Sequence, residues 1–373
     1  MENNEYSDYR KETEPIRPAA PANHFANEPK PQPEKRRMNF WSCCSVVCVA
    51  IVLMITLTTC GLFTLIGKGF ESAMESTDSE DEYDILKNAK HLQGPSDAEK
   101  IIAVINVKGI ILSDSKSSYD NANAAKICKL IRIADREPRV AAILLYLDTP
   151  GGEVTASDEI WNAVKKANKP VVAYMGSMAA SGGYYIASGA DKIVAHRTTL
   201  TGSIGVIIQT WNYHVLINRL GIEPQVYTSG KMKAMLHGGR KTSAEEKSIV
   251  QELVMSSYRE FLKVVADGRK IPYEKLINSP LTDGRILDGK QALAAGLVDM
   301  NGYFDDAVRE AEKMGKASPD TTKVLLMKPQ TNFMDILMEF STSVGKPSVK
   351  VDLPGSSSFQ LTPGKAYYLP VNQ

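Results

Sequence analysis

The sequence predicts an α/β fold with a mostly parallel sheet, and two observations carry this prediction. First, short apolar runs rich in β-branched residues alternate with segments of helical periodicity between residues 101 and 175. Second, the helical segments are long enough to carry the chain back across a sheet, as parallel strands require. Glycine-bearing turns follow two of the apolar runs, at the strand ends where open α/β sheets gather their functional groups.

The expected elements follow from the spacing of apolar residues. In chain order they are a strand over 101–111, a helix over 123–136, a strand over 140–148, a helix over 157–167, a strand over 169–175 and a helix over 243–270. The last helix begins with a capping box, in which Ser243 is the N-cap residue and Glu246 lies three residues later. Cys128 is expected in the core of the first helix, because a free cysteine behaves as a small hydrophobic residue.

Composition excludes several classes of protein. The formal charge of +1 over 373 residues argues against nucleic-acid binding, which needs a clustered basic surplus. Four of the five cysteines lie in one apolar run near the N-terminus, so the rest of the chain is not a disulfide scaffold. Neither a cofactor nor a metal site is expected.

The first hundred residues predict a membrane anchor. Residues 1–37 carry six prolines and many charges, and we expect a disordered tail. Residues 38–67 carry no charge and exceed the roughly 20 apolar residues that span a bilayer, which predicts a transmembrane helix. An acidic linker, 68–97, follows. Basic residues precede the apolar run, so the N-terminus is expected in the cytoplasm and the remaining chain outside it, on the far side of the cell membrane.

Two alternatives for this segment stay open. One is a cleaved signal peptide, although the preceding segment is long and no A-x-A site follows. The other is lipid modification of Cys60, which the sequence "LTTC" (57–60) indicates only weakly. Both place residues 68–373 outside the cytoplasm.

The stretch "GSMAASGGYYIASGADKIVA" (176–195) surrounds Ser181 with small residues at an expected strand-to-helix turn. A serine there can project its hydroxyl, and the glycine pair "PGG" (150–152) lets backbone N–H groups approach a ligand closely. Acyl transfer needs this arrangement, a nucleophile beside donors for an oxyanion. The alternative is that the small residues merely allow a helix to pack tightly on the sheet.

A serine nucleophile needs a base, and the chain offers two kinds. The histidines are His24, His91, His196, His214 and His237. None has an obvious aspartate partner, so a Ser-His-Asp triad lacks support. Lys231 and Lys233 lie beside apolar neighbours and would share one face if the segment were extended. Burial lowers the pKa of a lysine and allows it to act as a base, whereas a solvated surface lysine stays charged.

Five motifs occur in an order that resembles a known family. They are "DTPGGEV" (148–154), "GSMAASGGYYIASGADKIVA" (176–195), "TGSIGV" (201–206), "SGKMK" (229–233) and "GRILDGKQALAAGLVD" (284–299). Together they resemble signal peptide peptidase A, also called protease IV, in its short single-copy form. The resemblance covers roughly residues 98–316.

The resemblance implies a role for each matching residue. Ser181 corresponds to the nucleophile and Lys233 to the general base of a Ser-Lys dyad, whereas Lys231 occupies a variable position. Ser203 corresponds to a serine that orients the lysine amine. Gly152, helped by a backbone N–H near Ser181 such as that of Gly182, corresponds to the oxyanion hole. One departure is Ala234, because an acidic residue often follows the lysine in this family.

The resemblance also implies an architecture and a function. The fold is that of the crotonase and Clp-protease superfamily, with repeated ββα units, and short members form homo-oligomeric rings that bring serine and lysine together across a subunit boundary. A serine peptidase domain over 98–316 would follow the anchor, and a C-terminal extension over 317–373 would end the chain. The expected function is a membrane-anchored serine endopeptidase that degrades signal-peptide remnants and similar apolar peptides.

Two other functions stay open. A catalytically silent membrane-anchored scaffold of the same fold would act by binding partners, but the presence of both Ser181 and Lys233 argues against it. An acyl-CoA enzyme of the crotonase type would share the oxyanion hole, but export from the cytoplasm removes it from acyl-CoA.

The C-terminal residues 346–373 contain four prolines and a Gly-Ser run and are not expected to be helical. The sequence "AYYLP" (366–370) suits an extended strand. We expect it to lie along a sheet edge or groove, either steadying a ring or occupying the substrate groove, and the alternative is a flexible tail.

Overall fold

A computed structural model describes residues 88–113 and 121–328, the single positions Met54, Thr56 and Leu86, and the backbone of 367–368. The chain divides into two compact units, Met1–Glu75 and Ser76–Gln373, and the fold below is that of the second. Within the described part, the helices are too short or too polar to cross a bilayer. The expected tail, transmembrane helix and most of the linker lie outside the described residues.

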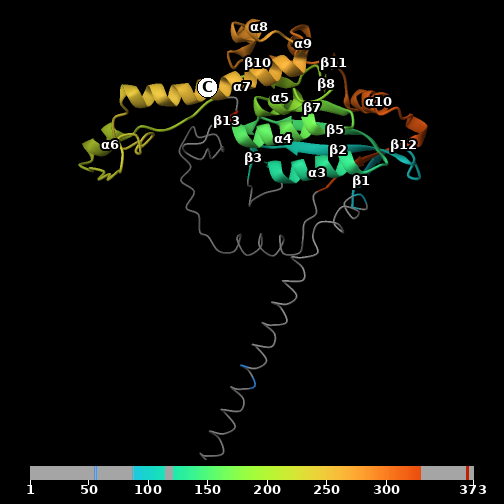
Figure 1. Ribbon diagram of the computed structural model, residues 1–373, viewed down its shortest axis with the longest axis horizontal. Helices are drawn as coiled ribbons and strands as arrows, with labels where there is room; N and C mark the ends of the chain where they lie inside the picture. The colour runs from blue at the N-terminus through green and yellow to red at the C-terminus, as the bar shows by residue number, and fades with distance from the viewer. Residues whose placement is uncertain are drawn as a thin grey trace, which may run out of the picture. The chain divides into compact units, whose positions relative to one another are not determined.

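The second unit is built on a twisted, mostly parallel sheet (Figure 1). Its nine strands in the described part are, in spatial order, β1 (Lys90–Gln93), β12 (Thr322–Leu326), β2 (Lys100–Lys108), β5 (Val140–Thr149), β7 (Val171–Ala180), β8 (Lys192–Ala195) and β11 (Met300–Asn301), with β9 (Leu200–Gly202) paired to both β7 and β10 (Ile286–Asp288). Among the described strands of this sheet, only the β1–β12 and β9–β10 pairs are antiparallel. The mixed α/β fold with a parallel-rich sheet is therefore confirmed.

Both faces of the sheet are covered, which explains why its central strands are continuous apolar runs. One face packs against α3 (Ala124–Arg136), α4 (Val154–Lys166), α5 (Gly182–Ala187) and the second half of α7 (Ala244–Arg269). The other face packs against α10 (Phe304–Met314). The expected strands and helices all occur, with ends shifted by a few residues. The same unit also contains α8 (Tyr273–Ile277), α9 (Gly289–Ala294) and two 3₁₀ turns, Pro280–Thr282 and Pro319–Thr321.

Two local predictions are confirmed. Ser243 accepts a hydrogen bond from the Glu246 N–H, and the Glu246 side chain accepts one from the Ser243 N–H, so the capping box starts α7. Cys128 is buried in α3, and burial raises the pKa of its thiol.

A second, small sheet lies at the carboxyl ends of the main strands. It consists of β13 (Tyr367–Tyr368), β6 (Gly152–Glu153), β3 (Ile111–Leu112) and β4 (Ala122–Asn123), in that spatial order. β13 pairs antiparallel with β6, and Tyr368 faces Gly152 in the register. The expectation that the C-terminal segment adds a strand to a sheet edge is confirmed.

The sheet extends beyond the 98–316 range that the motifs indicate. β12 pairs with β2 in parallel from Thr322 opposite Lys100 to Leu326 opposite Val104, and β1 pairs with the outer edge of β12. Neither β1 nor β12 carries a motif, because their place in the sheet depends on pairing between distant parts of the sequence.

An arm, defined here as residues 207–243, leaves this core. It contains α6 (His214–Arg219), and none of its residues belongs to either apolar core cluster. The 26-residue α7 is about 39 Å long, and it buries only the residues near its C-terminal end and the cap residue Glu246. In Figure 1 the first half of α7 and α6 accordingly extend beyond the end of the sheet.

Candidate active site

Ser181 lies between the end of β7 and the start of α5, in a strained backbone conformation. Its φ of 54° and ψ of −114° fall in a region that non-glycine residues rarely adopt. The side chain is fully buried, and its Oγ has no hydrogen-bond partner in the described part of the chain. A buried unsatisfied hydroxyl costs free energy, and strain of this kind concentrates at functional sites.

The surrounding backbone holds Ser181 firmly. The Ser181 N–H donates to the Gly202 carbonyl at 2.8 Å, and the Ser181 carbonyl accepts from the Tyr185 N–H at 2.9 Å. Tyr184 on α5 is fully buried, and its hydroxyl donates to the Leu297 carbonyl at 2.8 Å. Burial raises the pKa of Tyr184 well above its ordinary value, so this phenol is a neutral anchor for α5 and not an acid or base.

The glycine pair that follows Ser181 is required by close packing. A Cβ on Gly182 would lie 2.5 Å from Ser157 Oγ and 3.2 Å from the backbone nitrogen of Gly152. A Cβ on Gly183 would lie 2.7 Å from Thr149 Cγ2. Tight packing of helix on sheet and an unusual serine therefore occur together, and the same glycines bring the start of α5 against the turn after β5.

Gly152 cannot be replaced by a larger residue without moving backbone. A Cβ there would lie 1.9 Å from the carbonyl oxygen of Ile111, because β6 is pressed against β3. The preceding Gly151 has a φ of 107°, which favours glycine. Gly152 and Gly182, both assigned to the oxyanion hole by resemblance, therefore lie side by side next to Ser181.

Ser203 lies next to Ser181 in the sheet register. β7 and β9 run parallel, with Ala180 opposite Gly202, so the two serines follow paired residues. Ser203 is also buried and has a φ of 50°, and its N–H donates to the Arg285 carbonyl at 2.8 Å.

Lys233 is not part of this cluster within one chain. It lies in a series of turns over 231–236, exposed to solvent, with its N–H donating to the Gly230 carbonyl at 3.0 Å. In the described structure its amine makes no hydrogen bond to Ser181 or Ser203. The segment is not extended, and Lys231 instead forms an exposed ion pair with Glu245. The chain therefore assembles the serine side of the site and leaves the lysine on the arm.

A histidine base does not replace the lysine. Four of the five histidines are described: His91, His196, His214 and His237. His196 pairs with the hydroxyl of Thr198 at 2.8 Å, and His214 pairs with the amide oxygen of Asn212 at 2.8 Å. Among the described residues, no histidine hydrogen-bonds to Ser181 or to a carboxylate, so no Ser-His-Asp triad forms there.

The arm exposes many large apolar side chains. They are Trp211, Tyr213, Val215, Leu216, Leu220, Ile222, Val226 and Tyr227. Trp211 is 76% exposed and Tyr227 is 90% exposed, which is unusual for residues of this size. Eight exposed large apolar side chains within one short segment indicate a site of interaction.

Arg240 is a residue that sequence reasoning overlooked. Its guanidinium contacts the Glu246 carboxylate and the carbonyl of Ala234, next to Lys233. The signal in the sequence was an arginine six residues before the glutamate of the capping box, but spacing alone does not separate such an arginine from a surface one.

Comparisons with known proteins support the family resemblance. The model of peptidase family S49 matches residues 163–318, a range that includes Ser181, Ser203 and Lys233. A protein of Enterococcus faecium that is provisionally named signal peptide peptidase SppA is 38% identical over 242 residues, which cover 63% of this chain and 70% of that protein.

Two longer relatives match over a smaller share of their length. Protease 4 of Salmonella typhi is 36% identical over 228 residues, 60% of this chain and 36% of that protein. The chloroplastic serine protease SPPA of Arabidopsis thaliana is 32% identical over 226 residues, 59% of this chain and 33% of that protein. The chain therefore belongs to the signal peptide peptidase A family of serine peptidases, peptidase family S49.

Proposed function

We propose that this protein is a membrane-anchored endopeptidase in which Ser181 is the nucleophile and Lys233 of a neighbouring copy is the general base. The observation that carries the proposal is the buried, strained and unpartnered Ser181 beside Gly152 and Gly182. A hydroxyl that lacks a partner within the described chain, at a fixed backbone position, is suited to receive one from outside it.

The proposed reaction follows ordinary acyl transfer. Ser181 Oγ forms a bond to the carbonyl carbon of the peptide while its proton passes to the neutral amine of Lys233. The carbonyl oxygen becomes an oxyanion, which the N–H groups of Gly152 and Gly182 stabilise. The C–N bond then breaks, and the leaving amine takes the proton from Lys233. Water completes the cycle by the same steps, giving its proton to Lys233 and releasing the acid as Oγ regains a proton.

Two features of the arm support a base from a second chain. The arm carries Lys233 away from the core, and it exposes the apolar side chains that a neighbouring chain would cover. A head-to-tail interface repeated around a closed ring would give each serine a lysine, and burial there would favour the neutral amine. The ring and the crotonase and Clp-protease type of fold are implied by the family resemblance.

The binding mode of the substrate follows from the small sheet. β6 accepts β13 as an antiparallel neighbour, so its edge can pair with an extended peptide backbone next to Ser181. Backbone pairing gives affinity for many sequences, and an apolar setting would favour apolar peptides. We propose signal-peptide remnants as substrates, delivered from the membrane in which residues 38–67 anchor the protein, with the peptidase domain outside the cytoplasm.

A silent scaffold remains the competing proposal, because serine and lysine are apart in one chain. Incubation of the full-length protein in detergent micelles with a synthetic signal peptide separates the two. We expect cleavage by the wild type and loss of on the order of 10⁶ in turnover for Ser181→Ala, with folding unchanged. Cleavage by the alanine variant within tenfold of wild type would overturn the assignment of the nucleophile, and an inactive wild type would favour the scaffold.

A further inference from the structure

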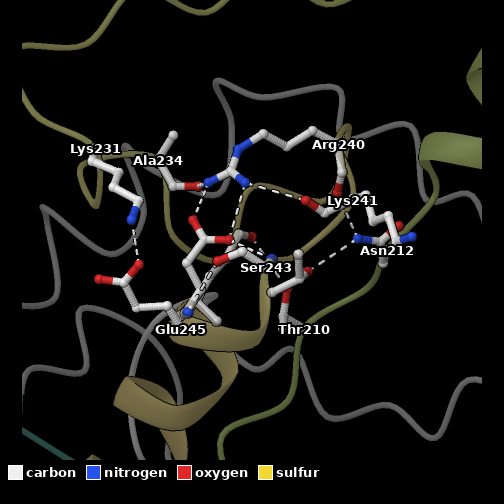
Figure 2. Close-up of polar contacts among 11 residues, drawn as sticks. Thr210, Asn212, Lys231, Ala234, Arg240, Lys241, Ser243 and Glu245 are labelled. Atoms are coloured by element: carbon white, nitrogen blue, oxygen red, sulfur yellow. Dashed lines mark hydrogen bonds and ion pairs between the residues drawn. The ribbon is translucent and has the colours of Figure 1, made fainter.

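The turn that carries Lys233 is held through the backbone of the next residue. The Ala234 carbonyl accepts a hydrogen bond from Arg240 Nη2 at 2.8 Å and another from the His237 N–H at 3.2 Å. Figure 2 shows the Arg240 guanidinium directed at Ala234 from one side of the turn. A guanidinium is a rigid planar group, so a bond to the Ala234 carbonyl fixes the Ala234–Met235 peptide unit, one residue beyond Lys233.

Arg240 is held in turn by an ion pair with Glu246. Arg240 Nη1 donates to Glu246 Oε2 at 3.0 Å, and Nη2 donates to Oε1. The guanidinium and the carboxylate therefore form a bidentate ion pair. The Glu246 side chain is only 3% exposed, although the arm around it is largely solvent-accessible. The same carboxylate accepts the Ser243 N–H at 2.8 Å, so Glu246 serves the helix cap and Arg240 together.

The other side of the arm braces the same turn. Asn212 Nδ2 donates to the Arg240 carbonyl at 2.7 Å, and Thr210 Oγ1 donates to the Leu236 carbonyl at 3.3 Å. Leu236 has a φ of 65°, so the turn is held in a conformation that it would not adopt freely. Figure 2 shows Asn212 beside the backbone of Arg240, on the side of the network away from Lys231.

Helix α7 connects this network to the core. Glu246 lies in the first turn of α7, and Phe261, Leu262 and Val265 near its end are fully buried in the core. Hydrogen bonds between successive turns make an α-helix rigid, so the buried end of α7 fixes the position of its first turn. The series of contacts therefore runs from the Ala234 carbonyl, one residue beyond Lys233, through Arg240 and Glu246 to the core of the protein.

We propose that Arg240 and Glu246 form a clamp that positions the Lys233 amine for reaction, and this inference rests on the function proposed above. Both are positioning residues, because neither reaches the reacting atoms. Exact placement matters because a displacement of about 1 Å in a catalytic group can lower the rate roughly a hundredfold.

Glu246 keeps its negative charge over the pH range of the proposed reaction. Hydrogen bonds from Arg240 lower the pKa of Glu246 to about 2, so the carboxylate is ionised throughout neutral and alkaline pH. Other charged or titratable groups near the turn are Lys231, Lys241, Glu245 and His237. A change in the alkaline limb of a pH–rate profile would therefore not report ionisation of Glu246.

Glu245 provides a matched control. It precedes Glu246 in the same helical turn and is also ion-paired, but its partner Lys231 is 75% exposed and its own side chain is 55% exposed. Figure 2 shows this pair at the side of the network, apart from Arg240. Glu245→Gln removes one negative charge, as Glu246→Gln does, but leaves the Arg240 hydrogen bond to the Ala234 carbonyl in place.

The test compares Arg240→Lys, Glu246→Gln and Glu245→Gln in the full-length protein, with a synthetic signal peptide as substrate. Glutamine can keep the capping bond to the Ser243 N–H, so Glu246→Gln leaves α7 capped. We expect Arg240→Lys and Glu246→Gln to lower kcat roughly ten- to a hundredfold with little change in KM. The kcat of the double variant, Arg240→Lys with Glu246→Gln, should be no lower than that of the less active single variant. The kcat of Glu245→Gln should match that of the wild type.

Two outcomes separate this inference from the proposed function. If Lys233→Ala is inactive while Arg240→Lys and Glu246→Gln match Glu245→Gln in kcat, the clamp is wrong and the dyad stands. If Lys233→Ala keeps its activity, the dyad and the clamp as a catalytic device both fail. Hydrogen exchange supplies a readout without activity: the Met235 and His237 N–H groups should exchange at least tenfold faster in the two clamp variants than in Glu245→Gln, and equal rates would also overturn the clamp.

Discussion

Ser181 and Ser203 leave two adjacent parallel strands at the same level, each with a positive φ and each buried. The residues before them, Ala180 and Gly202, face one another in the register, and the Ser181 N–H donates to the Gly202 carbonyl at 2.8 Å. The pairing of β7 with β9 therefore fixes the two hydroxyl-bearing residues relative to each other. This relationship distinguishes a preformed part of a candidate active site from a serine whose only role is packing.

The first prediction concerns Ser203. We expect Ser203→Ala to lower turnover by roughly ten- to a hundredfold, because the lysine amine would lose a hydrogen-bond partner that orients it while the nucleophile remains. The loss should be far smaller than that of Ser181→Ala. Turnover of the two variants on one synthetic peptide makes the comparison, and equal losses would contradict an orienting role.

The second prediction concerns the glycine after the nucleophile. Gly182→Ala should lower kcat at least tenfold, because its Cβ would meet Ser157 Oγ at 2.5 Å and push α5 from the Gly152 turn. Adding Ser157→Ala removes the clashing oxygen and should restore part of the rate. If the double variant is as poor as Gly182→Ala, the clash with Ser157 is not the cause.

The third prediction separates the two lysines. Lys233→Ala should be inactive, whereas Lys231→Ala should keep most of its activity because Lys231 only forms an exposed ion pair. The wild-type rate should rise with pH into mild alkali, since a lysine must lose its proton before it can act as a base. A rise governed by a group near pH 6.5 that disappears when a histidine is replaced would indicate a histidine base instead.

The fourth prediction concerns the C-terminal strand. β13 lies on the edge of β6 at Gly152 and Glu153, where a peptide substrate would pair. Deletion of residues 355–373 should therefore raise the peptidase rate at low substrate concentration by lowering KM. Oligomer mass is measured on the same sample. A lower mass would instead show that the strand steadies the assembly, and no change in rate or mass would show neither role.

Much of the fold was predictable because it depends on patterns among residues that are close in the sequence. The β-branched runs that became β2, β5 and β7 are buried on both faces, so their apolar continuity is unbroken. Ser243 and Glu246 form the expected capping box, which depends on residues three apart in sequence. Tight packing of a helix on the sheet was one of the two readings of the small residues around Ser181, and Gly182 and Gly183 show such packing against the side chains of Ser157 and Thr149.

The rest depends on pairing between distant segments. β12 joins the sheet beside β2, more than 200 residues away, and no local pattern specifies that partner. The exposed setting of Lys233 depends on how α7 packs, because the buried end of this helix leaves the arm outside the core. The positive φ of Ser181 was also unpredictable, since tertiary contacts impose it against the residue's own preference.

The most direct measurement is complementation between two inactive variants, because it tests whether Ser181 and Lys233 of different copies form one site. Ser181→Ala and Lys233→Ala are coexpressed in equal amounts with distinguishable tags, and assemblies that contain both are purified and assayed. If the dyad forms across a repeated head-to-tail interface, about a quarter of the wild-type activity should return, since a site needs the intact serine from one copy and the intact lysine from the next. Mixed assemblies as inactive as either variant alone would contradict the account.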